Sequence, residues 1–168
     1  MTISKTPAPC WVGPVAGGDD AGARLAARRM DAAGLAAVLR DGGEPAHVVA
    51  SADHARVLDL CLEAPARVAT LTLLSPPPFE SLDPAFVARL KSLEVPTLVL
   101  FGALSSHEPA APGTRWRRAL GKAFLVYVFD AVDPIEASRP GAVADVTGDF
   151  IARRDGFLVR ARDDRLNP

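Results

Sequence analysis

Short apolar runs alternate with amphipathic segments along most of this chain. Wholly apolar runs are typical of strands buried on both faces of a parallel sheet, and here they cover residues 46–50, 68–74, 96–101 and 124–129. The segment from Trp11 to Val15 has room for one further short strand. Strands that alternate with helices predict right-handed crossovers and an α/β fold of three layers, with a mostly parallel sheet between helices on both faces.

The segments between these runs have the composition and spacing of helices. Residues 54–64 carry apolar side chains at helical spacing, which predicts one buried face. Residues 21–40 are rich in alanine, leucine and arginine, and Gly42 with Gly43 supplies a stop. The other expected elements are a helix that starts at Asp83-Pro84, helices over 113–120 and 140–153, and a short strand over 156–161.

Length and composition predict one globular domain of nearly balanced charge. The chain has 168 residues with 49% hydrophobic content, which favours an irregular leader (1–20), one α/β domain (21–155) and a C-terminal strand and tail (156–168). The 19 basic and 20 acidic residues nearly balance, so neither nucleic acid nor a membrane is an expected partner. No apolar run approaches twenty residues and no secretory signal is recognisable, which predicts a soluble, cytoplasmic protein. Two isolated cysteines predict no metal site, and we expect no cofactor.

One stretch in the first half of the chain resembles the nucleophile elbow of the α/β-hydrolases. Their pattern Gly-x-Ser-x-Gly places a serine on a sharp turn between a strand and a helix. Residues 49–53 read VASAD, so Ser51 falls on the serine position while both glycines are replaced. The spacing from Ser51 to Pro65, and the apolar run from there to Ser75, also follows the family.

The resemblance extends through most of the chain. Residues 94–102 (EVPTLVLFG) are similar to the family's strand before the catalytic acid, and residues 138–150 are similar to its last helix. The resemblance implies a minimal α/β-hydrolase-like domain that lacks the opening strands and the cap. No oxyanion loop is recognisable in residues 1–18.

The catalytic triad of that family can be carried over position by position. Ser51 stands for the nucleophile. The acid lies three residues after the glycine that ends its strand, which from Gly102 gives Ser105. The histidine lies seven residues before the proline of the last helix, which from Pro140 gives Asp133. A serine hydroxyl needs an adjacent base that is itself held in place, so these replacements predict a pseudo-hydrolase rather than an active serine hydrolase.

The carboxyl ends of parallel strands are the usual ligand-binding edge of such a sheet, and they supply our candidate ligand-binding residues. These candidates are Ser51, Asp53, His54, His107 and Asp133. A pair of His54 or His107 with Asp133 would supply acid–base chemistry. The structural alternatives are helix capping for Asp53 and His54, a solvated loop for His107, and a turn for Asp133.

Three classes of function follow from these residues. The first is a noncatalytic protein that acts by binding a partner protein or forming a homodimer. The second is a sensor of a small apolar ligand, or a nonhydrolytic enzyme such as a lyase, isomerase or cyclase that uses His54 or Asp133. The third is a remnant hydrolase with Ser51 as its nucleophile. Because fold alone does not fix function, the site must decide between them.

Overall fold

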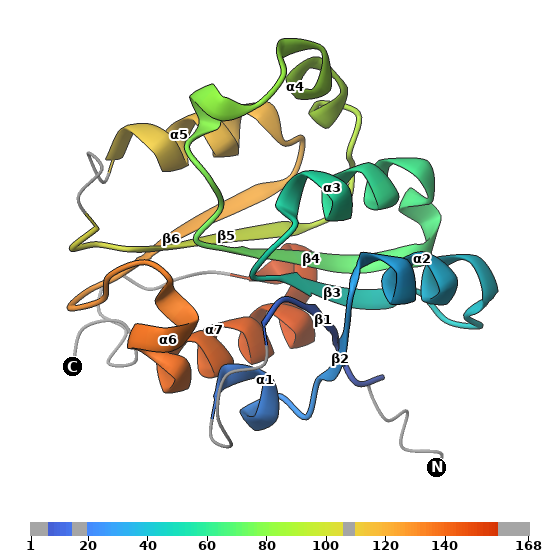
Figure 1. The fold of residues 1–168 in the computed structure, drawn as a ribbon, viewed down its shortest axis with the longest axis horizontal. Helices are drawn as coiled ribbons and strands as arrows, with labels where there is room; N and C mark the ends of the chain where they lie inside the picture. The colour runs from blue at the N-terminus through green and yellow to red at the C-terminus, as the bar shows by residue number, and fades with distance from the viewer. Residues whose placement is uncertain (1–6, 15–19, 106–109, 158–168) are drawn as a thin grey trace.

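The computed structural model describes residues 7–14, 20–105 and 110–157, and within them six parallel strands form one sheet (Figure 1). The strand order is β2-β1-β3-β4-β5-β6, so β2 and β6 are the edges. The strands are β1 (Cys10–Val12), β2 (Arg28–Met30), β3 (Ala46–Ala50), β4 (Val68–Leu74), β5 (Thr97–Gly102) and β6 (Ala123–Val128).

Helices cover both faces of this sheet. One face carries α2 (Ala32–Asp41), α3 (His54–Glu63), α4 (Pro84–Leu90) and α5 (Ala110–Ala119), and the other carries α1 (Ala21–Arg24), α6 (Ile135–Ser138) and α7 (Pro140–Arg153) (Figure 1). Short 3₁₀ turns lie at Pro65–Arg67, Phe79–Ser81 and Arg154–Gly156. The expected three-layer α/β fold is therefore confirmed.

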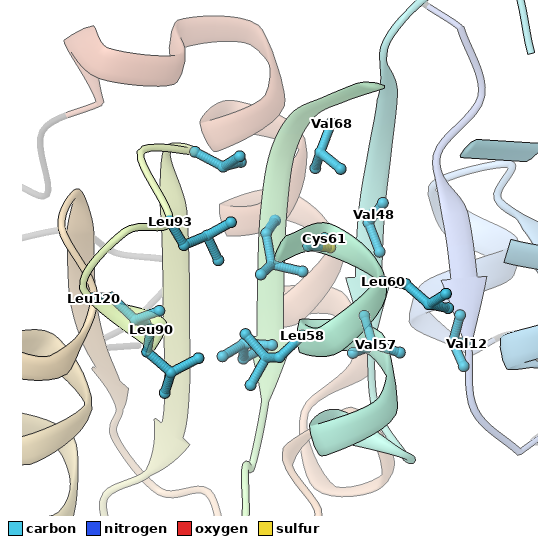
Figure 2. Close-up of a cluster of buried hydrophobic side chains, with 14 of the residues drawn as sticks. Val12, Val48, Val57, Leu58, Leu60, Cys61, Val68, Leu90, Leu93 and Leu120 are labelled. Carbon is cyan, nitrogen blue, oxygen red and sulfur yellow. The ribbon is translucent and has the colours of Figure 1, made fainter. Parts of the chain in front are cut away.

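Each face of the sheet has its own apolar core, because successive strand residues point to opposite sides. Val48 packs with Leu58 and Cys61 of α3 on one side (Figure 2). Val49 packs with Val143 and Phe150 of α7 on the other side. The predominantly apolar sequences of the central strands follow from this double burial.

Most predicted elements lie where the pattern placed them. β3 and β4 match the predicted ranges, β5 and β6 are shifted by one residue, and α7 matches. The stop at Gly42 is confirmed, since α2 ends at Asp41 with Gly42 as its C-cap. None of the helices in residues 7–14, 20–105 and 110–157 is both long and apolar enough to cross a membrane.

The single helix predicted over residues 21–40 is wrong. The segment instead forms α1, the edge strand β2 and α2. Ala26 adopts a left-handed φ of 51° that ends α1, and Arg28 N donates to Pro9 O to begin pairing with β1. The side chain of Asp31 then accepts from Gly34 N and starts α2. Tertiary pairing overrides the helix propensity of this arginine-rich segment.

Both ends of the chain also differ in part from the prediction. β1 is the short strand expected near residues 11–15, and it lies between β2 and β3 inside the segment expected to be an irregular leader. At the other end, Phe157 is buried with its ring centroid 5.6 Å from that of Phe124 and 5.4 Å from that of Phe150. Most of the strand predicted over 156–161 lies outside the described residues and stays a prediction.

Candidate functional site

All the strands are parallel, so the carboxyl ends of β3, β4, β5 and β6 lie on the same side of the sheet. We call this side the strand-end edge, as distinct from the edge strands β2 and β6. Ser51 follows β3, Ser75 follows β4, Ser105 comes three residues after β5, and Asp133 lies in the loop after β6. The candidates Ser51, Asp53, His54 and Asp133 therefore lie at the carboxyl ends of the strands, where the sequence analysis expected them. His107 lies outside the described residues.

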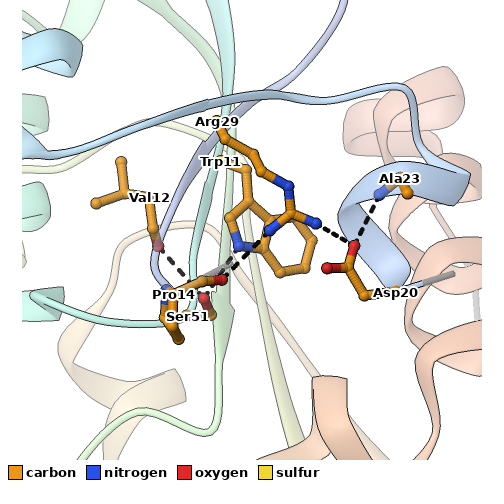
Figure 3. A network of polar contacts seen from close by, with 7 residues as sticks. All are labelled: Trp11, Val12, Pro14, Asp20, Ala23, Arg29 and Ser51. Carbon is orange, nitrogen blue, oxygen red and sulfur yellow. Dashed lines mark hydrogen bonds and ion pairs between the residues drawn. The ribbon is translucent and has the colours of Figure 1, made fainter. Parts of the chain in front are cut away.

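The hydroxyl group of Ser51 is bound by the neighbouring strand β1. Trp11 Nε1 donates to Ser51 Oγ at 3.1 Å, and Ser51 Oγ is 3.4 Å from the carbonyl oxygen of Val12 (Figure 3). Gly13, with φ at 155°, lies against Ser51 Oγ, and a Cβ at Gly13 would clash with that oxygen. Among the described residues, Ser51 Oγ thus contacts an indole and a backbone carbonyl rather than an imidazole.

An arginine on the edge strand holds this corner of the sheet together. Arg29 forms an ion pair with Asp20, donates to Pro14 O at 3.3 Å, and lies over the Trp11 ring at 5.9 Å from its centroid (Figure 3). Asp20 also accepts from Ala23 N at 2.8 Å and so caps α1. Burial acts to raise the pKa of Asp20, but the Ala23 hydrogen bond and the Arg29 charge outweigh it and hold the pKa below its usual value.

The turn between β3 and α3 is built differently from the expected elbow. Asp53, not Ser51, is the left-handed residue, with φ 49° and ψ 33°, directly before the first residue of α3. Aspartate tolerates this conformation better than most residues, which explains how the turn forms without the elbow glycines. Ser51 lies two residues earlier, beside the end of the strand. The sharp turn on which a hydrolase nucleophile is exposed therefore presents an aspartate here.

The side chain of Asp53 is exposed and makes no capping hydrogen bond to α3. Asp53 therefore occupies the N-cap position of α3, as the structural alternative expected, but its side chain does not cap the helix. Asp53 instead contributes the left-handed backbone of the turn, and its carbonyl oxygen accepts from Val57 N. Its carboxylate is left facing solvent at the strand-end edge.

His54 is buried and bonded to the backbone. Its Nε2 lies 2.8 Å from Leu74 O, at the end of β4. Burial lowers the pKa of His54, while hydrogen bonds to the carbonyl oxygens of Leu74 and Ala50 and the charge of Asp53 act in the opposite direction. The imidazole thus ties α3 to the ends of β3 and β4.

Asp133 is the centre of a second polar cluster, and its partners come from two other strand ends. One carboxylate oxygen accepts from Ser75 Oγ at 2.5 Å and from Gly102 N at 3.0 Å. The other accepts from Ser105 Oγ at 2.6 Å. The backbone N–H of Asp133 donates in turn to Ser105 Oγ at 2.9 Å, and Ile135 N donates to Ser75 Oγ at 2.9 Å. We call Ser75, Gly102, Ser105 and Asp133 the aspartate clamp.

The aspartate clamp joins the two replaced triad positions to each other. Ser105, at the acid position, donates to Asp133, at the histidine position. Both oxygens of Asp133 are engaged within the clamp, and Nε2 of His54 is on a carbonyl oxygen, so the His54–Asp133 pair that we considered is not formed. In the part of the chain that the structure describes, no group of three His, Cys, Asp or Glu side chains is placed to hold a metal ion.

Two features of the clamp were not identified from the sequence. Ser75 comes from 58 residues earlier in the chain than Asp133, so only the fold brings them together. Gly102 can donate its N–H to Asp133 because the loop after β6 passes close to its backbone. A Cβ at Gly102 would lie 2.5 Å from Ala131 O, so a larger residue would push this loop away. Beside the clamp, burial and the charge of Asp133 raise the pKa of Glu136.

Comparisons with known proteins identify the fold of the chain through similar solved structures. No protein-family model matches the sequence, and no curated protein matches it. Among solved structures, the chain is similar to a predicted CIB-like hydrolase from Thermoplasma acidophilum, with a TM-score of 0.58, 20% identity, and coverage of 72% of this chain and 59% of that chain. It is also similar to naproxen esterase (carboxylesterase NP) from Bacillus subtilis, with a TM-score of 0.61, 15% identity, and coverage of 85% and 83%. Est1E from Butyrivibrio proteoclasticus has a TM-score of 0.66 at 10% identity, with coverage of 91% and 90%.

These neighbours share the α/β-hydrolase fold, and the described residues form a reduced version of it. The fold expected from the resemblance is therefore confirmed. The chain spans 59% of the length of the Thermoplasma protein. At such low identities the likeness concerns the fold alone, and the activity has to be argued from the site.

Proposed function

We propose that this chain, which has an α/β-hydrolase fold and in which no base lies beside Ser51 among the described residues, is a noncatalytic member of that fold that acts by binding another molecule at the strand-end edge. The observation that carries the proposal is the aspartate clamp. The residue at the histidine position, Asp133, is held by three donors of the clamp and has no free oxygen with which to act as a base. A serine without an oriented base is a poor nucleophile.

The surroundings of Ser51 support the same conclusion. Its oxygen is in contact with Trp11, Val12 and Gly13, so a substrate carbonyl has no open approach from that side. The buried N–H of Trp11 needs a hydrogen-bond acceptor, and the hydroxyl group of Ser51 supplies it. This gives a structural reason for a serine at this position. We infer that Ser51 fastens β1 to β3.

Labelling and turnover measurements test this proposal. We expect the purified chain to hydrolyse p-nitrophenyl acetate and butyrate no faster than its Ser51→Ala variant, and to remain unlabelled by a fluorophosphonate. Ser51→Ala should instead lower the free energy of unfolding by about 1 kcal/mol, since the buried Trp11 N–H loses its acceptor. Stoichiometric labelling that disappears in Ser51→Ala would contradict the proposal and favour the remnant hydrolase.

A second candidate, a nonhydrolytic enzyme, is favoured by one observation. Asp53 stands on the turn where this fold presents its nucleophile, and its carboxylate is exposed and not used for capping. A carboxylate in that place is suited to general-base catalysis in a lyase or isomerase acting on a small apolar substrate. Turnover of such a substrate that is lost in Asp53→Asn but kept in Ser51→Ala would favour this candidate over the first.

A further inference from the structure

Three large apolar side chains stand exposed at the strand-end edge. Leu104 is 62% exposed, Phe129 53% and Val132 48%, and they are the exposed large hydrophobic residues of the part of the chain that the structure describes. Leu104 belongs to the loop after β5, and Phe129 and Val132 belong to the loop after β6. We call these three side chains the rim patch. Exposed apolar residues gathered in one place mark interaction sites, whereas scattered ones need no explanation.

The backbone beneath the rim patch is held by hydrogen bonds between the two loops. Ala103 N donates to Val128 O at 2.9 Å, and Leu104 N donates to Ala131 O at 2.9 Å. The aspartate clamp, through Ser105 and Asp133, fastens the same two loops. A platform that is already ordered loses little conformational entropy when a partner binds. The rim patch is thus preformed.

The described residues of the two loops that carry the rim patch are acidic where they are charged. The loop residues 102–105 and 129–134 contain no lysine or arginine and include Asp130 and Asp133, and the first basic residue after them is Arg139, which follows α6. Asp130 is exposed directly beside Phe129.

We propose that the rim patch binds a segment of a partner protein that carries apolar side chains flanked by lysine or arginine. The apolar contacts would come from Leu104, Phe129 and Val132, and the charge complementarity from Asp130. The inference rests on the proposed noncatalytic function, for which it names the partner. A second copy of the chain fits this surface less well, because a two-fold axis through the patch would place Asp130 of one copy near Asp130 of the other. An anionic membrane is disfavoured by the same charge.

A peptide selection with the full chain tests the proposal. A displayed library of random twelve-residue peptides would be selected against the biotinylated chain, and the best sequences measured by fluorescence anisotropy. We expect the enriched peptides to combine large apolar residues with a net positive charge. The dissociation constant should rise at least tenfold in Phe129→Ser and in Val132→Ser, and severalfold in Asp130→Asn. Glu44→Gln, which removes an exposed acid before β3 at the opposite edge of the sheet, should change nothing.

The opposite results would overturn the inference. These are a library that enriches no sequence, enriched peptides that are neutral or acidic, or binding that is the same in Phe129→Ser and Val132→Ser. A wild-type dimer in sedimentation that Phe129→Ser turns into a monomer would assign the patch to a second copy instead. Ester hydrolysis is measured on the same samples. Hydrolysis abolished by Ser51→Ala would refute the noncatalytic function and leave the peptide result standing, so the two failures are distinguishable.

Discussion

Replacing Asp133 by asparagine tests whether the aspartate clamp stabilises the fold. The substitution keeps the size of the side chain and one acceptor oxygen, but it removes the negative charge. It also turns the group that faces Ser105 Oγ from an acceptor into a donor, although Ser105 Oγ already accepts from the Asp133 N–H at 2.9 Å. The hydroxyl hydrogen of Ser105 then has no acceptor within the clamp.

The expected loss follows from the three hydrogen bonds that the carboxylate accepts. A hydrogen bond to a charged group contributes about 1.5–3 kcal/mol, against about 1 kcal/mol for a neutral one. Weakening three bonds, with a reduction because Asp133 is partly exposed, gives a loss of about 2 kcal/mol in the free energy of unfolding. For a chain of this length that corresponds to a melting temperature lower by about 4–8 °C.

Urea denaturation followed by circular dichroism measures this loss, and Asp130→Asn is the matched control. Asp130 lies in the same loop and is exposed, and its left-handed φ of 53° suits asparagine equally well. We expect Asp130→Asn to stay within about 0.5 kcal/mol of the wild type. If Asp133→Asn is no more destabilising than Asp130→Asn, the clamp does not stabilise the fold and the reasoning is wrong.

Three further predictions concern other contacts. Gly102→Ala should lower the free energy of unfolding by about 2 kcal/mol because its Cβ would lie 2.5 Å from Ala131 O, and a urea titration that shows no change would contradict this close approach. Glu136→Gln should raise the free energy of unfolding at pH 8 by about 0.5 kcal/mol, because burial and the charge of Asp133 raise the pKa of Glu136 and its ionisation above that pKa costs stability, partly screened by solvent. An equal gain for Glu136→Gln at pH 4 would refute this cause. Burial lowers the pKa of His54, so the free energy of unfolding should fall as the pH drops below about 6.5, with a slope of at most about 1.4 kcal/mol per pH unit from this group. Urea titrations at pH 7, 6 and 5 should show a flatter profile in His54→Gln, and an unchanged profile would assign the slope to other groups.

The sequence predicted the central elements well because their pattern reflects burial on both faces. The runs that became β3 and β4 are buried on both faces, and few other structures accommodate such a run. The helix predicted over residues 21–40 failed for the opposite reason. The edge strand β2 is only three residues long, and its sequence RRM has no strand pattern, so nothing but its pairing with β1 defines it.

The candidate site was predictable in part. Counting along the resemblance placed Ser105 and Asp133 on neighbouring strand ends, and the structure brings them into contact. The same counting could not show that Ser75 belongs to the aspartate clamp, because its contact with Asp133 depends on the order of the strands in the sheet. The turn residue was assigned to Ser51 rather than Asp53 because a serine in a motif is visible in the sequence, whereas a left-handed backbone is not.

The central position of β1 has a consequence for how the chain can be cut. Only three residues, Cys10–Val12, separate β2 from the rest of the sheet, and they pair on both sides. Trimming the chain to begin at Ala21, as a boundary drawn from composition would suggest, deletes the strand that joins β2 to β3. The remainder would keep a contiguous sheet of β3 to β6 and strand β2 alone. Proteolysis near Gly13 should therefore unfold the domain rather than shorten it.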